Sequence, residues 1–334
     1  MNFDGIIGHE KQKLFLNSLS RSGRIPQSLL FTGIPGVGKK LMAKRFIAGL
    51  FCPEPDPPCL RCPSCLRVQQ GTHPDYLELS PGDKGNIPIG NEEKREPGSV
   101  RWLIDRLNRK AVTGRYGVIV DGADAIAEEG QNALLKTIEE PSPGSVIILI
   151  ASNRSALLPT IISRSVELKY FPLKEGEISL MIETAVPDHE RRDTIALLSG
   201  GSPSLAYFLS DPEVLEDLLS AAASFKTVIE KGALLAADID SLLGRFGPEK
   251  LLNALINLYR ANVLAPLGAF PAVPPPLSGL FYDDVPTARE LVKIFVALKK
   301  GQSHNLNFRI ALKGMLYSLC SASVNEGVRM RDFP

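Results

Sequence analysis

The chain has 334 residues, of which 44% are hydrophobic and 22% charged, an ordinary composition for a globular protein long enough for two or three domains. Its formal net charge of +1 gives no electrostatic reason to expect strong nucleic-acid binding by the free chain. No apolar run reaches about 18 residues and the N-terminal residues lack an apolar core, so the sequence predicts a cytoplasmic protein with neither a membrane span nor a signal peptide.

The first half of the chain alternates strand-like and helical segments. The apolar runs typical of buried strands are 28–34, 115–124, 144–153 and 164–171. Helical spacing is found at 41–51 and at 128–140, where Pro141 ends the second pattern. Strands separated by helices predict an α/β fold with a parallel sheet and crossover connections.

A glycine-rich loop follows the first strand-like run and fits the phosphate-binding pattern G-x-x-x-x-G-K. Its residues are Gly33, Gly36, Gly38, Lys39 and Lys40. The glycines allow backbone N–H groups to surround phosphate oxygens, and Lys39 would reach the terminal phosphates. The last position usually carries a Ser or Thr that holds Mg²⁺, whereas Lys40 has no hydroxyl and adds a charge that disfavours the cation. The pattern predicts a degenerate nucleotide site and leaves binding of ATP and Mg²⁺ open, with an incidental glycine-rich turn as the alternative.

Four of the five cysteines lie within fourteen residues, at Cys52, Cys59, Cys62 and Cys65. In a reducing compartment such a cluster indicates a metal site rather than disulfides. Four thiolates favour a structural Zn²⁺, and an iron–sulfur cluster is the alternative. Cys65 is followed by leucine and not by the proline of the ferredoxin pattern, which favours zinc. Cys320 stands apart and is interpreted as a buried, inert thiol.

The run 115–124 ends in the sequence VIVDGAD, with Asp121 at the end of the predicted strand. A nucleotide-hydrolysing fold places its Mg²⁺-associated carboxylate at this point, although capping of a following helix explains the residue equally well. Gly122 stands where a Glu would activate water, and Asp124 is three residues past Asp121 and a poor substitute. Two groups needed for hydrolysis, a hydroxyl at position 40 and a Glu at 122, are therefore missing.

After Phe171 the strand pattern disappears and helical patterns continue. The segment 265–279 is rich in proline and is predicted to be a loop between helices.

Arg164, in the sequence SRS, stands at the start of the last predicted strand. An arginine there is usually solvated, but one supplied to a neighbouring subunit's phosphates stabilises transition-state charge. Spacing alone does not choose between the two interpretations.

Several of these motifs together resemble the bacterial clamp-loader AAA+ family of DNA polymerase III. The glycine loop, the cysteine cluster, NALLKTIEEP (132–141) and LLPTIISRS (157–165) carry the resemblance. It is strong over 5–171, weaker over 172–208 and faint beyond, where the pattern at 301–319 is similar to the family's C-terminal helices. Within the family the sequence is most similar to the delta prime branch.

The resemblance implies three domains. They are an AAA+ α/β domain at 1–171 with an inserted zinc module at 52–65, a three-helix lid at 172–208 and a helical collar at 209–334 that joins subunits in a ring. It further implies gamma/tau and delta subunits as partners, and the β sliding clamp and primed DNA as what the assembly acts on. The chain would then belong to a DNA-directed DNA polymerase holoenzyme.

The family's motor subunits differ from this chain at three positions. They carry Thr or Ser at position 40, Glu at 122 and a nucleotide-sensing arginine at 204, where this sequence has Lys40, Gly122 and Ser204. In SRS the third residue is Ser165 instead of the usual cysteine, which leaves Arg164 in place. The resemblance thus implies a subunit without ATPase activity of its own that supplies Arg164 in trans. An ATP-hydrolysing gamma/tau-like subunit is the first alternative, and a DNA-binding zinc protein is the second.

Overall fold

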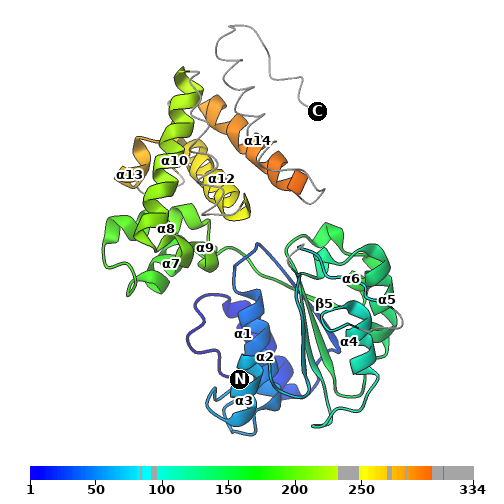
Figure 1. The fold of residues 1–334 in the computed structure, drawn as a ribbon. Coiled ribbons are helices and arrows are strands. Elements are labelled where there is room, and N and C mark those ends of the chain that lie inside the picture. The colour runs from blue at the N-terminus through cyan, green and yellow to red at the C-terminus, as the bar shows by residue number, and fades with distance from the viewer. Residues whose placement is uncertain are drawn as a thin grey trace. The chain divides into compact units, whose positions relative to one another are not determined.

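The computed structural model describes residues 1–82, 85–91, 96–231, 248–268, 273–282, 285–302 and 311. The chain divides into two compact units, Met1–Pro172 and Leu173–Pro334 (Figure 1). Cys320 and most of the C-terminal pattern at 301–319 lie outside the described residues. Among the described helices none is long and apolar enough to cross a membrane.

The first unit is built on a five-stranded sheet with the strand order β2-β3-β4-β1-β5, in which every pair is parallel. The strands are β1 (Ser28–Thr32), β2 (Tyr76–Leu79), β3 (Gly117–Asp121), β4 (Val146–Ala151) and β5 (Val166–Lys169). The predicted parallel sheet is confirmed. Strand β2 was not predicted, because four residues are too few to show a clear pattern.

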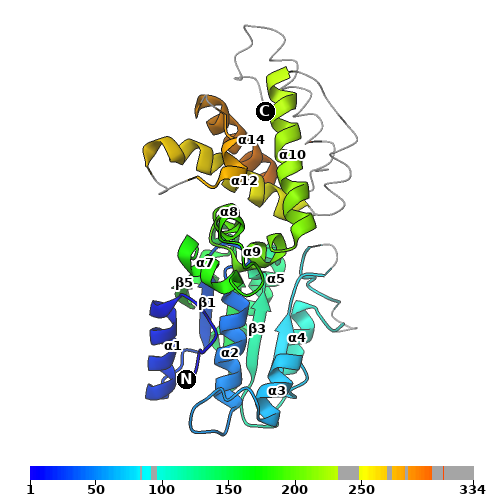
Figure 2. The ribbon, with the colours of Figure 1, turned by 90° about the vertical axis from the view of Figure 1, so that its left-hand side faces the viewer.

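Helices cover both faces of this sheet (Figures 1 and 2). On one face lie α1 (Glu10–Ser22), α2 (Lys39–Phe51) and α3 (Pro63–Gln70), and on the other α4 (Val100–Leu107), α5 (Glu128–Glu139) and α6 (Pro159–Ser163). Alternate residues of one strand enter different cores, so Phe31 packs with the α2 side and Leu30 with the α4 side. The strands are therefore apolar throughout, as parallel strands covered on both faces require.

The described residues of the second unit form helices and the turns between them, with no strand among them. Its helices are α7 (Glu175–Ile182), α8 (His189–Ser199), α9 (Pro203–Leu209), α10 (Pro212–Lys231), α12 (Pro248–Leu264), α13 (Pro275–Ser278) and α14 (Val285–Gln302). One hydrophobic core runs from Leu173 to Leu298, and the Asn257 side-chain amide donates to the carbonyl of Leu198 at 2.8 Å. This bond joins α12 to the end of α8. The boundary at 208 and 209 between a lid and a collar stays a prediction.

The proline-rich segment is not only a loop. It contains a 3-10 turn at Ala265–Leu267 and the one-turn helix α13, which begins at Pro275. Proline blocks the interior of a helix but suits its first turn, where no backbone N–H donor is needed. The prolines of this segment therefore mark a helix start as well as breaks, and the prediction of a loop over the whole of 265–279 was wrong at α13.

Candidate functional site

The glycine loop joins β1 to α2 and has the conformation of a phosphate-binding loop. Gly33, Gly36 and Gly38 have φ of 149°, 73° and 108°, values that side chains rarely tolerate. A Cβ at Gly33 would lie 2.3 Å from the carbonyl oxygen of Tyr170. Helix α2 begins with no side-chain cap and no acidic residue in its first turn. Its N-terminal N–H groups and positive dipole end thus suit an anion.

Lys39 is the first residue of α2 and is only 5% exposed. Its ammonium donates to the carbonyls of Gly33 and Ile34, the latter at 2.8 Å, and to the Ser152 hydroxyl at 3.3 Å. Burial lowers the pKa of Lys39 to about 8, although two nearby carboxylates act in the opposite direction. The side chain is folded onto the loop, and phosphate oxygens would have to replace these carbonyl partners.

Lys40 binds carboxylates from two neighbouring strands. Its Nζ lies 2.7 Å from Glu78 Oε1 at the end of β2 and 3.1 Å from Asp121 Oδ2 at the end of β3. Lys44, one turn further along α2, contacts the other Glu78 oxygen at 3.0 Å, and the Tyr76 hydroxyl also donates to Glu78. Two ammonium groups and two carboxylates therefore balance each other beside the loop.

The pKa values of these groups reflect the pairing. Burial alone would raise the pKa of Glu78, but hydrogen bonds from Lys40, Tyr76 and Lys44 outweigh it and lower the pKa to about 2. Burial alone would lower the pKa of Lys40, but the hydrogen bonds and charges of Glu78 and Asp121 raise it. Both partners are therefore ionised at neutral pH.

This donor set does not fit Mg²⁺. Phosphate-loop proteins hold the ion with the Ser or Thr after the loop lysine and an Asp at the end of a neighbouring strand. Here the two corresponding residues, Lys40 and Asp121, form an ion pair with each other. A divalent ion would face an ammonium group and compete with it for the same carboxylate.

Position 122, where the water-activating glutamate is missing, also has a backbone geometry that disfavours any side chain. Its φ is 80°, and a Cβ added there would lie 2.9 Å from the Pro81 side chain. The following 3-10 helix, Ala123–Ala125, has no side-chain cap, so the expected alternative of Asp121 as a helix cap is not observed. Asp124 accepts hydrogen bonds from the backbone N–H groups of Ser152 and Asn153, at 3.0 and 2.7 Å, and fixes the end of β4.

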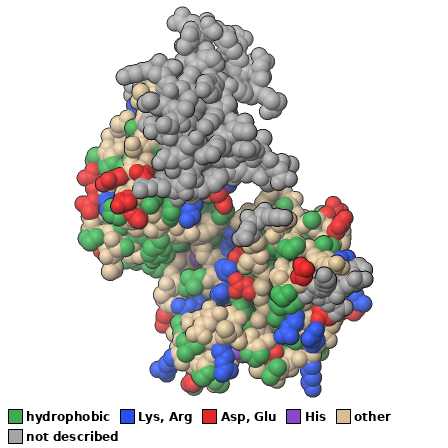
Figure 3. Space-filling view, viewed as in Figure 1, with side chains coloured by type: hydrophobic (Ala, Val, Ile, Leu, Met, Phe, Trp, Pro, Cys, Tyr) green, Lys and Arg blue, Asp and Glu red, His purple; other side chains and the backbone are tan. Residues whose placement is uncertain are grey.

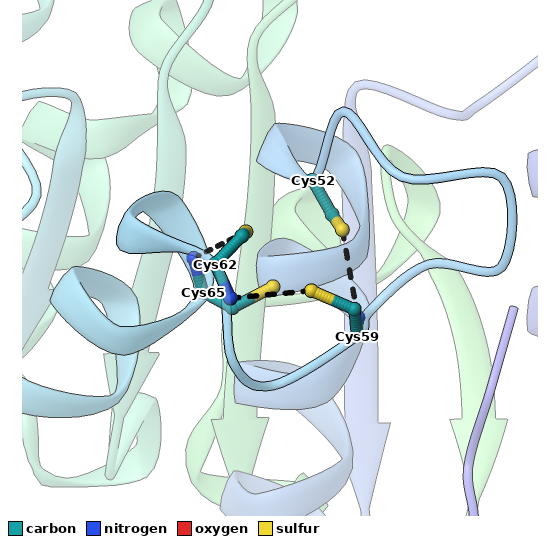
Figure 4. A group of neighbouring side chains, drawn as sticks. All are labelled: Cys52, Cys59, Cys62 and Cys65. Atoms are coloured by element: carbon teal, nitrogen blue, oxygen red, sulfur yellow. Dashed lines mark hydrogen bonds between the residues drawn. The ribbon is translucent and has the colours of Figure 1, made fainter.

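The four predicted cysteines come together at the opposite end of α2. Cys52 follows the last residue of that helix, Cys59 lies in the next loop, and Cys62 and Cys65 form the start of α3. Their sulfur atoms all lie within 4.8 Å of one another, and Figure 4 shows them turned toward a common centre. Zn–S bonds of about 2.3 Å in a tetrahedron place sulfurs about 3.8 Å apart, so a small contraction would close the site around a metal.

Backbone N–H groups already point at the thiols. The N–H groups of Cys59, Cys62 and Cys65 lie 3.5, 3.3 and 3.4 Å from the sulfurs of Cys52, Cys59 and Cys62, respectively. Such donors stabilise thiolates and thereby favour metal binding. Cys65 is fully buried and packs with α2 in the hydrophobic core. The four residues can hold a metal such as zinc.

Arg164 does not start the last strand, as the sequence suggested. It caps the C-terminus of α6, and β5 begins two residues later at Val166. Its guanidinium pairs with Glu139 at the end of α5 and donates to the carbonyl of Thr160 at 3.2 Å. The side chain is 41% exposed and is therefore accessible to solvent.

Three residues of these sites were missed by sequence reasoning. Glu78 and Glu139 pair with the predicted residues Lys40 and Arg164, and Lys44 pairs with Glu78. Lys44 follows Lys40 by four positions, a spacing that puts both on one helix face. Glu78 could be identified only if β2 had been predicted. Glu139 could be identified only from the packing of α5 on α6. Ser204 is exposed on α9.

Comparison with known proteins identifies a family. Residues 8–174 match the family model described as DNA polymerase III, delta subunit. The DNA polymerase III subunit delta' of Pseudomonas aeruginosa is 32% identical over 225 residues, 66% of this chain and 66% of that protein. The DNA polymerase III subunit tau/gamma of Haemophilus influenzae is 33% identical over 181 residues, 53% of this chain and 25% of that protein.

Among solved structures, a DNA polymerase III gamma subunit-related protein of Thermotoga maritima aligns with a TM-score of 0.49 and 19% identity, over 92% of this chain and 99% of that one. Of the two sequence relatives, this chain matches just under two thirds of the delta' protein and about a quarter of the tau/gamma protein.

Proposed function

Since the chain belongs to the DNA polymerase III delta-subunit family, we propose that it is a delta prime-type clamp-loader subunit that does not hydrolyse ATP itself. Relatives of both the delta prime and the tau/gamma type support a clamp-loader role. The proposed partners are gamma/tau and delta subunits, together with the β sliding clamp and primed DNA that the assembly would act on.

The observation that carries the delta prime assignment is the ion pair between Lys40 and Asp121. Phosphoryl transfer depends almost entirely on positioning and on electrostatic stabilisation by Mg²⁺ and a water-activating group. Lys40 takes the carboxylate that would hold the ion, and the backbone of Gly122 leaves no room for a glutamate. A motor-type subunit requires both.

The proposed contribution of this chain to ATP hydrolysis is Arg164. It is exposed and lies on the turn between α6 and β5, at an edge strand of the sheet. In a ring of similar domains a guanidinium there would fork onto the γ-phosphate of a neighbour and stabilise the charge of the transition state. The cysteine site would hold one structural Zn²⁺.

A DNA-binding zinc protein is less well supported. On the face shown in Figure 3, basic and acidic side chains of the described residues are interspersed, and the formal net charge of the chain is +1. Proteins that bind DNA through its backbone gather basic side chains on one surface.

The test of the proposed function uses the full chain alone and in a reconstituted clamp loader. The chain alone should show no ATP turnover above background. When mixed with gamma/tau and delta subunits, it should co-purify with them. Steady turnover that disappears in Lys39→Ala would identify a motor-type subunit instead. Failure to co-assemble would contradict the clamp-loader role itself.

The arginine is tested in the same reconstituted assembly. Arg164→Ala should leave the chain folded and assembled but lower the DNA-stimulated ATPase by about tenfold at the site it faces, less than the roughly 10³–10⁵ known for a single arginine finger. Arg164→Lys should lower the ATPase nearly as much, because the point charge of an ammonium cannot replace the planar, two-pronged guanidinium. The matched control is Arg109→Ala, which removes another exposed arginine paired with an acid, Asp105. Unchanged turnover with Arg164→Ala would exclude a trans role.

A further inference from the structure

We propose that Arg45 is a positioning residue for the cysteine site, where its guanidinium offsets the negative charge that the four thiolates acquire when they bind a metal ion. Arg45 lies in the middle of α2, the helix that ends at the cysteine cluster. The proposal rests on the metal site alone and is independent of clamp loading and of the phosphate loop.

The cysteine site becomes strongly negative when a metal binds. Four thiolates around one divalent ion leave about two negative charges in excess. The module cannot offset them itself, because within 52–65 one basic residue, Arg61, stands against two acidic ones, Glu54 and Asp56. Cys65 is fully buried, and a charge held away from water is costly unless an opposite charge lies near it. A cation from outside the module therefore stabilises the metal-bound site.

Arg45 is placed to supply that cation. It precedes Cys52 by seven residues, about two turns of a helix, so both lie on the same side of α2. It also precedes Ala48 by three residues, and the Ala48 carbonyl accepts a hydrogen bond from the Cys65 thiol at 3.8 Å. Burial lowers the pKa of Arg45, and the charges of Asp4 and Cys65 oppose this shift. Arg45 and Cys65 are therefore close enough for their charges to interact.

The guanidinium of Arg45 lacks the partners that such a group usually has. Its Nη1 is buried from water and has no hydrogen-bond partner within the described part of the chain. Other arginines of the first unit pair with carboxylates, as Arg109 does with Asp105 and Arg154 with Glu167. A buried donor without a partner is costly, so its presence requires an explanation. Attraction to metal-bound thiolates supplies one.

The experiment measures Zn²⁺ binding by the full chain under reducing conditions, in competition with a chromogenic chelator. Arg45→Met replaces the guanidinium with an uncharged, flexible side chain. It should weaken zinc binding by about 10–100-fold, the usual effect of losing an outer partner of a metal site. Arg45→Lys keeps the charge and should recover most of the affinity. The matched control, Arg67→Met, removes an exposed arginine two residues past Cys65, whose charge water screens, and should change the affinity by less than about twofold.

Two further readouts separate charge balance from packing. The Co²⁺-substituted chain should show the same thiolate-to-metal absorption per ion in every variant, because the four cysteines are unchanged. In urea unfolding without metal, Arg45→Met should be at least as stable as the unmodified chain, since it removes a guanidinium with an unpaired, buried nitrogen. Zinc should then raise the unfolding midpoint less in Arg45→Met than in the unmodified chain. Circular dichroism checks folding, and Arg45→Gln takes the place of Arg45→Met if that variant does not fold.

Three outcomes would overturn the proposal. They are an unchanged zinc affinity in the neutral variants, a loss in Arg45→Lys as large as in Arg45→Met, and equal destabilisation of Arg45→Met with and without zinc, which would assign Arg45 a packing role. A chain that binds no metal at all would overturn the proposal together with the metal site. None of these outcomes bears on co-assembly or on Arg164, so the proposed function stands or fails by its own test.

Discussion

The two ends of helix α2 hold their charges in different ways. At its N-terminus Lys40 and Lys44 neutralise two carboxylates with ammonium groups of the chain itself. At its C-terminus four thiols lie within 4.8 Å of one another and can hold a metal ion from outside. A side-chain ammonium is a permanent partner, whereas a metal must be acquired. One end of α2 is therefore paired by the chain itself, whereas the other offers a site for an ion.

The two ends thus show two ways of holding charged or polar groups around one helix. Beside the phosphate loop, the ion pairs of Lys40 join α2 to the ends of β2 and β3. The cysteine module has no such substitute, and its two buried thiols, Cys62 and Cys65, belong to the core that packs on α2. Variants at each end should accordingly fail in different ways.

The largest effect is expected at the metal end. Cys62→Ser should reduce bound zinc from one ion per chain to none, because a closed tetrahedral site needs all four thiolates. The free energy of unfolding should fall on the order of 4 kcal/mol, since loss of a metal belongs to the most damaging class of changes. Elemental analysis and urea unfolding measure the two quantities.

The control for that variant is Ser64→Ala, in the same turn but not a ligand, which should keep its zinc. Iron in place of zinc, or a disulfide between Cys52 and Cys65 under reducing conditions, would contradict the metal assignment.

The next largest effect is expected beside the phosphate loop, at Gly122. Gly122→Ala combines a φ of 80° with a contact of 2.9 Å to Pro81, so it should cost about 2 kcal/mol of stability. Gly114→Ala is the matched control, because Gly114 has a φ of 88° with open space around it. That variant should lose only about 1 kcal/mol, for the backbone conformation alone. Equal losses in thermal unfolding would show that Pro81 does not exclude a side chain at 122.

The smallest effect concerns pH and the ion pair of Glu78. Because its pKa in the folded chain is about 2, below the usual 4.5, the ionised carboxylate stabilises the fold. This contribution is fully present above about pH 4.5 and disappears as the pH falls toward 2.

Glu78→Gln should accordingly be less stable than the unmodified chain at pH 7, by about 1–2 kcal/mol once solvent screening is allowed for. This difference in the free energy of unfolding should disappear as the pH falls toward 2. A gap that stays constant from pH 7 to pH 3 in urea unfolding would mean that Glu78 contributes packing and not charge.

Much of the first unit was predictable from local pattern. The four predicted strand segments contain β1, β3, β4 and β5, and the helix predicted at 128–140 is α5, which ends before Pro141 as expected. The cysteine spacing predicted a cluster that the structure brings together. Each of these signals depends only on residues that are close together in the sequence, as periodicity, glycine positions and ligand spacing do.

Other features could not be predicted from such patterns. Strand β2 is too short to stand out, and without it the partner of Lys40, Glu78, stays hidden. Arg164 was placed at the start of a strand because the run 164–171 resembles one, but helix α6 extends to Ser163 and Arg164 caps it. Its pairing with Glu139 depends on two helices that only the fold brings together.

The sequence by itself determined that this chain has a parallel α/β domain, a phosphate loop with a lysine in place of a hydroxyl, and four clustered cysteines. Only the tertiary structure decided what that lysine does. The order β2-β3-β4-β1-β5 puts the carboxyl ends of β2 and β3 beside each other and next to the start of α2. Carboxylates from separate strands then meet one ammonium group, because parallel strands all end at the same edge of a sheet.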